Sequence, residues 1–211
     1  MTKKILITGA NGQLGHEMRN ALKGNNRFEC IFTDVAELDI CNAEAVKQII
    51  ADNHIDYIVN CAAYTQVDKA EDNAELCKKI NTDAVENLAR AAADYGARMI
   101  HISTDYVFNG RGYRPYTEDM VPDPQSVYGS TKLEGEKILT DICPESIIIR
   151  TAWLYSPYGN NFVKTMLHLG EEREELSVVA DQIGTPTCAA DLAQAILVIL
   201  QADTFVPGTY H

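Results

Sequence analysis

One stretch decides the fold: Lys3-Lys4-Ile5-Leu6-Ile7-Thr8-Gly9-Ala10-Asn11-Gly12-Gln13-Leu14-Gly15. Residues 3–8 predict a buried strand, and a helix is expected from about residue 13 to 23. The glycines between them have the spacing G-x-x-G-x-x-G, which permits a tight turn and a close approach of backbone to pyrophosphate. The helix N-terminus then offers free N–H groups to phosphates. A loose glycine loop is the alternative, but the position straight after the first strand favours a dinucleotide-binding turn, with candidate residues Gly9, Asn11, Gly12, Gln13, Leu14 and Gly15.

Strands and helices alternate along the next part of the chain. Strands are expected at residues 28–33, 57–61, 98–103 and 146–150, and helices at 43–52, 69–95 and about 126–140. This alternation is typical of a parallel sheet with helices on both faces. The fold class predicted is therefore α/β, a doubly wound parallel sheet of the Rossmann type.

The pattern after Arg150 is less regular. It predicts a helix at 161–170, a short strand at 176–179, a helix at 189–201 and a strand that is just beginning at 208–211. We therefore expect a dinucleotide-binding domain at 1–150 and a smaller, partial substrate domain at 151–211. Elements near 176–202 are candidates to pack back on the first domain, and the ending within a strand suggests a truncated C-terminus.

Composition narrows the class of protein. The chain has 211 residues, 46% of them hydrophobic and 23% charged, with a net charge of −12. This charge argues against nucleic acid or anionic lipid as main partners, although a small anionic ligand needs only a local site. No signal peptide or membrane-spanning run is recognisable, which predicts a cytoplasmic protein. The six cysteines and five histidines are scattered without ligand spacing, so reduced thiols and no metal site are expected.

Two further segments are candidates to contact a dinucleotide. Asp34 follows the second strand 19 residues after Gly15, where an acidic side chain can bind the adenosine ribose hydroxyls. Its charge would repel a 2′-phosphate, which favours NADH over NADPH; a capping or turn aspartate is the alternative. Asp39 and Ile40 are weaker candidates for the adenine edge, with an N-cap region as an equally favoured interpretation. Small residues after the third strand would let a cofactor approach the backbone, at Ala62, Ala63 and Tyr64.

The chemistry is expected at Tyr128 and Lys132, which are four residues apart and would share one helix face. A neighbouring cation favours the phenolate and would lower the pKa of the tyrosine, making it a usable proton donor. Thr104, in Ser103-Thr104-Asp105, leaves the preceding strand at the carboxyl edge of the sheet, where ligands bind in open α/β sheets. Its hydroxyl can donate a hydrogen bond to a substrate oxygen, and a core or turn hydroxyl is the alternative.

These motifs occur in the order found in a known family. The glycine turn is followed by Asn60-Cys61-Ala62-Ala63, Ser103-Thr104-Asp105 and Tyr128-x-x-x-Lys132. The chain resembles the extended short-chain dehydrogenases/reductases and, among them, the dTDP-4-dehydrorhamnose reductases. The resemblance runs along the whole chain, through 63–71, 103–108, 127–136, 150–155, 160–162 and 181–187.

The resemblance implies a catalytic triad of Thr104, Tyr128 and Lys132. It implies NAD(P)H-dependent reduction of the C4 keto group of dTDP-4-dehydro-6-deoxy-L-mannose, to give dTDP-L-rhamnose. Tyr128 would protonate the oxygen, Lys132 would tune Tyr128 and hold the nicotinamide ribose, and Thr104 would polarise the carbonyl. Related sugar 4,6-dehydratases have an acidic pair after the threonine, whereas here Asp105 precedes Tyr106, which favours simple reduction.

The implied substrate site is formed by residues from several segments. Thr65, Val67 and Trp153 are expected around the sugar, because an indole face can cover apolar C–H surface. Core packing is the alternative for Trp153. Thr104, Asp105 and Tyr106 complete this set, and two weaker candidates follow it in the chain, Asn161 and Gln182.

Several points stay open at the level of sequence. Some family members form dimers bridged by Mg²⁺; Glu17 matches one ligand position, but the next falls on Ala190 beside Asp191, so no metal is predicted and a homodimer is only possible. One alternative function is a non-catalytic regulator, because the regulatory beta subunit of methionine adenosyltransferase resembles this family. Another is a reductase of a different nucleotide-linked 4-keto sugar.

Overall fold

The main sheet is parallel throughout and runs in the order β2-β1-β3-β4-β5-β8. The protein is described here by a computed structural model covering residues 2–211. The strands of this sheet are β1 (Lys3–Thr8), β2 (Phe28–Phe32), β3 (Tyr57–Asn60), β4 (Arg98–Thr104), β5 (Ile147–Thr151) and β8 (Gly208–Tyr210). From β1 the chain goes to β2 on one side and then to β3 on the other. This reversal creates a crevice at the carboxyl edge, between β1 and β3.

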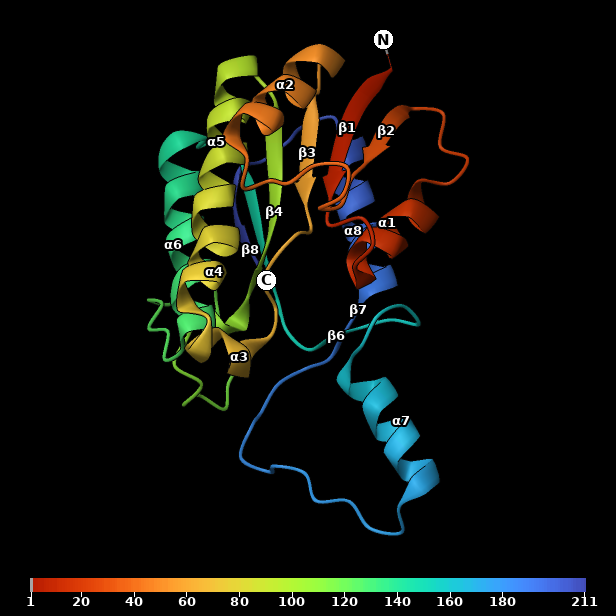
Figure 1. The fold of residues 1–211 in the computed structure, drawn as a ribbon, viewed down its shortest axis with the longest axis vertical. Coiled ribbons are helices and arrows are strands. Elements are labelled where there is room, and N and C mark those ends of the chain that lie inside the picture. Colours follow the sequence, from red (N-terminus) through yellow and green to blue (C-terminus); the bar gives the residue numbers. More distant parts are fainter. Residues whose placement is uncertain (1) are drawn as a thin grey trace.

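Helices cover both faces of the sheet (Figure 1). The alternation along β1 shows why, because Ile5, Leu6 and Ile7 are all fully buried. Leu6 packs in the core that holds α2 (Ala43–Asn53) and α5 (Ala84–Tyr95), with α6 (Val127–Ile142) beside α5. Ile5 and Ile7 pack on the other face, under α1 (Gln13–Leu22) and α8 (Ala189–Gln201). The predicted doubly wound α/β fold is confirmed.

The expected long helix at 69–95 is wrong in detail, because it consists of four segments. These are α3 (Val67–Asp72), α4 (Ala74–Lys78), the π-helix η1 (Lys79–Asp83) and α5. Asn73 separates the first two, since its φ of −126° and ψ of 41° lie outside the helical region. The π-helical turn places Asn81 in the protein interior, which matters for the site below.

The expected strand at 176–179 is also wrong. Val178 and Val179 are 50% and 68% exposed, so their β-forming side chains have no sheet to pack against. The segment instead belongs to a long excursion between two short paired strands, β6 (Leu154–Tyr155) and β7 (Thr187–Cys188). The excursion contains α7 (Phe162–Glu172), which has no buried residue and extends away from the sheet in Figure 1.

The last two elements return to the sheet. α8 packs against α1, and β8 pairs with β5 as its outer neighbour. A boundary at residue 150 therefore separates α8 and β8 from the unit on which they pack, whereas β6, α7 and β7 lie outside that unit (Figure 1). The beginning strand expected at the C-terminus is present as β8.

α8 is a strongly apolar helix of 13 residues. Its buried side chains fill the core between α1 and the sheet, and they are Ala189, Leu192, Ala193, Ile196, Leu197 and Leu200. Within residues 2–211, neither this helix nor another is long and apolar enough to cross a membrane. The apolar character of α8 is therefore explained by its packing.

Candidate active site

The glycine loop brings β1, α1 and β3 into close contact. Gly9 has a φ of +63°, and a Cβ there would lie 2.7 Å from the backbone nitrogen of Ala62. A Cβ on Gly15 would overlap the backbone of Gly9 and Ala10. Both positions therefore require glycine, because a side chain would separate the helix from the strands.

The start of α1 is open to an anion. Gly12 is the N-cap, without a side-chain hydrogen bond, and the first turn has no acidic residue. Helix N-terminal N–H groups have no partners within the helix and attract phosphate groups. The close backbone approach at Gly9 and this uncapped turn suit the pyrophosphate of a dinucleotide.

The side chains of Gln13 and Leu14 have structural partners. Gln13 donates through Nε2 to the carbonyl of Leu154 at 3.4 Å and accepts at Oε1 from Asn161 Nδ2 at 2.9 Å. Leu14 is 5% exposed and packs in the core under α1. Only the backbone of these two residues is left for the contact with a phosphate that the motif predicts.

Asp34 lies directly against the glycine loop. Its carboxylate accepts from the backbone nitrogen of Asn11 at 2.9 Å and from that of Val35 at 2.8 Å. Its carbonyl also accepts from the nitrogens of Glu37 and Leu38, so it begins a turn as well. The carboxylate keeps lone pairs for ribose hydroxyls, so the turn and ribose interpretations are compatible.

Asp39 and Ile40 lie in the turn before α2. Asp39 is exposed and accepts from the backbone nitrogen of Cys41 at 2.9 Å. Ile40 is 7% exposed and belongs to the apolar core, so a contact with adenine stays a prediction for this pair. The helix cap itself is Asn42, whose side chain accepts from Ala45 N.

The close packing of α6 against the end of β4 brings Tyr128 to the turn that follows Thr104. A Cβ on Gly129 would overlap the carbonyl of Tyr106, which lies in the short helix η2 (Asp105–Val107). Glycine therefore lets α6 lie directly on the turn that follows Thr104. Ser126 caps this helix by accepting from the backbone nitrogen of Gly129, which begins α6 one residue before Tyr128.

Tyr128 is buried at the start of α6, with 8% exposure. The ring of Tyr106 meets it edge-on at a centroid distance of 5.5 Å. Burial raises the pKa of Tyr128 to about 12, and Thr104 opposes that effect only in part. The expectation of a lowered pKa is wrong here, because desolvation of the phenolate outweighs every other influence.

Lys132 is also buried, with 1% exposure. Its Nζ donates to the carbonyl of Ile102 at 2.7 Å and lies 3.3 Å from His101 Nε2. Burial lowers the pKa of Lys132 to about 8, although Glu136 and Cys77 act to raise it. An amine with such a pKa exchanges its proton near neutral pH.

Thr104 and Asp105 form a small polar pair beside Tyr128. Thr104 Oγ1 donates to Asp105 Oδ1 and accepts from the nitrogen of Tyr106, both at 3.2 Å. Burial raises the pKa of Asp105, and hydrogen bonds moderate the shift. The threonine hydroxyl is thus held at the edge of the sheet, where the prediction places it.

Three buried polar residues around the site were not selected from the sequence. Asn60 and His101 form a chain that ends at Lys132. Asn81, in the π-helical turn, accepts from the nitrogen of Tyr64 at 2.8 Å and donates to its carbonyl at 3.1 Å. It therefore fixes the loop that holds Ala62 and Ala63. The available signal for His101 was a histidine between apolar residues, in Met99-Ile100-His101-Ile102.

The candidate substrate residues surround the same edge. Thr65 is exposed, Val67 begins α3 half-buried, and Tyr106 packs with it around Tyr128. Trp153 is 41% exposed, so core packing is excluded as its explanation. Its φ of +48° is unusual for a bulky residue. The indole lies against Gly184, in the excursion between β6 and β7.

Among the weaker candidates, Asn161 caps α7 and Gln182 is exposed. The position matched to a metal ligand, Glu17, is buried and accepts from Asn20 Nδ2 at 3.1 Å. Within residues 2–211 no three His, Cys, Asp or Glu side chains are grouped as a metal site. All six cysteines are free.

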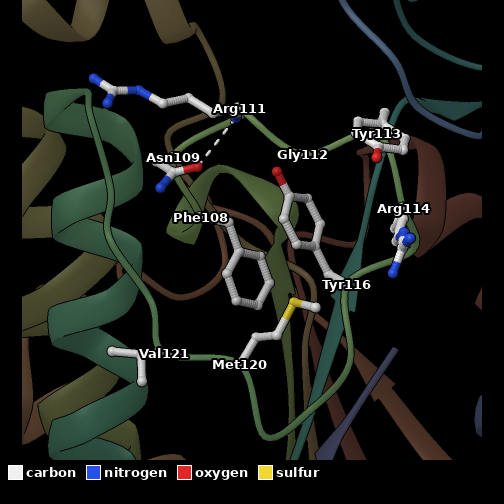
Figure 2. A pocket seen from close by; sticks show the side chains of 9 residues that line it. All are labelled: Phe108, Asn109, Arg111, Gly112, Tyr113, Arg114, Tyr116, Met120 and Val121. Carbon is white, nitrogen blue, oxygen red and sulfur yellow. Dashed lines mark hydrogen bonds between the residues drawn. The ribbon is translucent and has the colours of Figure 1, made fainter.

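Two hollows lie along the loop after β4. Figure 2 shows the smaller one, about 400 Å³, within the loop after β4, where Phe108, Tyr116 and Met120 face one another. The rings of Phe108 and Tyr116 stack at 4.3 Å. The larger cleft, about 930 Å³, runs from Asp105 past Arg150 to α8. Space for a bulky ligand therefore begins at the residue beside Thr104.

Fold and site together define a class of protein. A parallel sheet with a switch point, an uncapped glycine turn and a buried Tyr-Lys pair on the helix after β4 are the features of a Rossmann-type reductase of the extended short-chain dehydrogenase/reductase class. Residues 3–211 match the family model described as RmlD substrate binding domain. The chain belongs to this family.

Curated relatives and solved structures agree with this assignment. A dTDP-4-dehydrorhamnose reductase of Aggregatibacter actinomycetemcomitans is 44% identical over 99% of this chain and 72% of its own length. Its counterpart from Escherichia coli K12 is 46% identical, over 98% of this chain and 71% of its own length. The crystal structure of a dTDP-4-dehydrorhamnose reductase from Clostridium acetobutylicum has a TM-score of 0.94 and 50% identity, covering 99% of this chain and 73% of that one. The Bacillus anthracis enzyme, solved with NADP, has a TM-score of 0.95 and 44% identity, covering 100% and 74%.

Proposed function

We propose that this chain is an oxidoreductase that uses NAD(P)H to reduce the C4 keto group of dTDP-4-dehydro-6-deoxy-L-mannose, forming dTDP-L-rhamnose. The observation that carries the proposal is the position of Tyr128 and Lys132. They lie buried on α6, which Gly129 seats on the turn after Thr104. The relatives named dTDP-4-dehydrorhamnose reductase, at 44% to 46% identity, support the substrate.

The residues of the chain have distinct tasks in this reaction. When bound, a nicotinamide dinucleotide would supply the hydride for C4 of the sugar, and the displaced π electrons of the carbonyl would leave a negative charge on its oxygen. Tyr128 gives its phenolic proton to that oxygen, which yields the alcohol. Its raised pKa, about 12, keeps the phenol protonated before hydride transfer. Thr104, whose hydroxyl donates to Asp105 Oδ1 in the structure, would turn that hydroxyl to the substrate carbonyl and polarise it. Lys132 would hold the nicotinamide ribose.

The binding residues follow from the same geometry. The backbone at Gly9, Gly12 and Gly15 and the first turn of α1 hold the pyrophosphate, and Asp34 holds the adenosine ribose. Around the sugar we propose Thr65, Val67, Asp105, Tyr106 and Trp153. The excursion between β6 and β7, residues 156–186, serves as the part of the chain that faces the sugar nucleotide.

We propose a preference for NADH, because the Asp34 carboxylate lies on the loop where a 2′-phosphate would enter. Its neighbour there is the backbone nitrogen of Asn11, at 2.9 Å, and no cation is hydrogen-bonded to the carboxylate within the described residues. The Bacillus anthracis relative was solved with NADP, so the preference needs a direct comparison of the two cofactors. No metal is proposed. A homodimer and a cytoplasmic location stay predictions.

The test follows the loss of NADH or NADPH absorbance with dTDP-4-dehydro-6-deoxy-L-mannose. We expect turnover that falls by about 10²-fold or more in Tyr128→Phe, because the proton donor is lost. The relative from Escherichia coli K12 serves as positive control. Cofactor binding without turnover, under conditions in which the control is active, would contradict the proposal and favour a regulatory role.

A further inference from the structure

A chain of buried polar side chains lies behind Lys132. Lys132 Nζ is 3.3 Å from His101 Nε2, and His101 Nδ1 is 3.0 Å from Asn60 Nδ2. Asn60 Oδ1 in turn accepts from Thr8 Oγ1 at 2.6 Å. Asn60 and His101 are fully buried, and Lys132 is 1% exposed. The proton positions along this chain are therefore determined by the protein, not by solvent.

A backbone N–H group determines which side chains donate and which accept in this series of hydrogen bonds. Ala62 N–H donates to Asn60 Oδ1 at 3.2 Å. A backbone N–H can only donate, so the oxygen of the Asn60 amide must face Ala62 and the nitrogen must face His101. Since Nδ2 donates, His101 Nδ1 has to accept with a free lone pair.

This direction continues to Lys132. A histidine whose Nδ1 accepts is neutral and carries its proton on Nε2. That N–H lies toward Lys132 Nζ, which also donates to the carbonyl of Ile102 at 2.7 Å. A neutral amine has a lone pair for this N–H, whereas an ammonium has donors only. The arrangement thus fits an uncharged lysine better than a charged one.

We propose that His101, oriented by Asn60, is a positioning residue that favours the uncharged form of Lys132 and so sets the pH range in which Lys132 exchanges its proton. The ionic state of Lys132 does not depend on the proposed reaction, but its consequence for catalysis rests on that function. Each turnover removes a proton from Tyr128. A lysine that exchanges protons near neutral pH, one turn further along the same helix, can help to restore it.

The other groups facing Lys132 act in known directions. Glu136 on its own helix and Cys77 on α4 raise the pKa of Lys132, while burial lowers it to about 8. Tyr128 lies one turn before Lys132 on the same helix. The Glu136 carboxylate is already bound by Arg150, at 2.6 Å and 3.0 Å. The series of hydrogen-bonded side chains ends in two neutral residues, Asn60 on β3 and Thr8 on β1.

Imidazole ¹⁵N spectra of the wild-type protein, without cofactor, test the tautomer directly. We expect the His101 proton on Nε2 across the neutral pH range. A proton on Nδ1, or a charged ring, would overturn the proposal. This measurement needs no substitution, so it does not depend on the folding of a variant.

The substitution Asn60→Asp is designed to reverse the donor–acceptor direction of the hydrogen bonds that run from residue 60 through His101 to Lys132. A carboxylate keeps the bonds from Thr8 and Ala62 but accepts from Nδ1–H, so Nε2 becomes an acceptor for the Lys132 ammonium. In protein with ¹³C-labelled lysine, with Lys132 assigned by its loss in Lys132→Met, we expect the Lys132 titration midpoint to rise by about one pH unit or more.

The double variant Asn60→Asp/His101→Phe separates the tautomer effect from the charge of the new aspartate. Compared with His101→Phe alone, it reports that charge acting through space. The proposal requires that Asn60→Asp shifts the titration midpoint of Lys132 less in this background than with His101 present. Equal shifts would contradict it.

In the active enzyme, the basic limb of the kcat/KM pH profile should move to higher pH with Asn60→Asp. If the NMR shifts appear but no turnover is found, the tautomer assignment stands and the proposed function fails.

Discussion

At the scale of single residues, burial controls the ionisation of the catalytic pair. Tyr128 and Lys132 are each moved toward the uncharged form, to pKa values of about 12 and about 8. Both shifts arise mainly from desolvation, which disfavours the charged form of each group. It therefore raises the pKa of the tyrosine and lowers the pKa of the lysine. The protein interior thus keeps the phenol protonated, as a proton donor, and lets the lysine amine exchange its proton near neutral pH.

The buried lysine should appear in the pH dependence of stability. The pKa of Lys132 is about 8 in the folded state and 10.5 when unfolded. Between these values the unfolded chain binds more protons, so stability rises with pH. Relative to Lys132→Met, the wild-type free energy of unfolding should increase by about 3 kcal/mol between pH 8 and 10.5. Urea unfolding at several pH values measures this difference; a constant difference would contradict it.

The sequence predicted the identity of these residues but not their environment. Four-residue spacing was sufficient to place Tyr128 and Lys132 on one helix face. It could not show that Lys132 would contact Ile102 and His101, because those contacts join segments 30 and 31 residues apart. His101 was grouped with scattered histidines, since its role depends on a buried partner, Asn60, on another strand.

At the scale of elements, α6 is held to the sheet by a buried ion pair. Arg150 on β5 binds Glu136 through two hydrogen bonds of 3.0 Å and 2.6 Å. Their side chains are 8% and 4% exposed. The Arg150 guanidinium also lies 5.1 Å over the ring of Phe108. This pair therefore joins the catalytic helix, the neighbouring strand and the loop after β4.

Breaking one side of this pair should be more damaging than removing both. Arg150→Met leaves the Glu136 carboxylate buried without its partner and should destabilise by about 3 to 5 kcal/mol. The double variant Arg150→Met/Glu136→Leu removes the uncompensated charge and should recover a large part of that loss. Chemical denaturation of the three proteins tests this order. A double variant less stable than Arg150→Met would count against it.

The seating of α6 on η2 gives a second prediction at this scale. A Cβ on Gly129 would overlap the carbonyl of Tyr106, whereas one on Gly170 in α7 meets nothing within 4 Å. Gly129→Ala should therefore lower both the melting temperature and kcat by moving Tyr128 away from Thr104. Gly170→Ala, the matched control, should be neutral or stabilising by up to about 1 kcal/mol. Equal behaviour of the two variants would show that the close approach is not needed.

The elements that sequence predicted best are those with short-range signals. The glycine turn and the apolar strands 3–8 and 57–61 lie where expected, to within a residue. The break at Asn73 and the π-helical turn were not predicted. The π-helical turn contains Asn81, whose side chain accepts from the backbone nitrogen of Tyr64, 17 residues earlier, and such a contact leaves no short-range signal. The false strand at 176–179 had β-forming residues but no partner strand.

At the scale of the whole molecule, the fold gathers residues from distant segments at one edge. The ends of β1, β3 and β4 place the glycine loop, the loop after Asn60 and Thr104 side by side, because parallel strands all finish at the same edge. Two apolar cores, one on each face, hold this arrangement. The alternation of elements predicted this architecture, and elements near 176–202, which include α8, were candidates to pack back on it. The pairing of β8 with β5 needed the structure.

Cofactor binding should stabilise the whole fold by mass action. At a cofactor concentration of about 100 times Kd, the gain is about 3 kcal/mol. We expect a larger rise in melting temperature with NADH than with NADPH, because the Asp34 carboxylate repels the 2′-phosphate. Asp34→Ser should reduce the difference between the two cofactors. A larger rise with NADPH in the wild-type protein would contradict the proposed role of Asp34.

The most direct test of the proposed reaction follows the hydride itself. NADH, or NADPH, that carries deuterium on the transferred side of nicotinamide C4 is incubated with the protein and dTDP-4-dehydro-6-deoxy-L-mannose. We predict a dTDP-L-rhamnose product with one deuterium, at C4 of the sugar, by NMR and mass spectrometry. Formation of that product should be strongly reduced in Tyr128→Phe. Product without deuterium at C4, or no product while cofactor binds, would contradict the account.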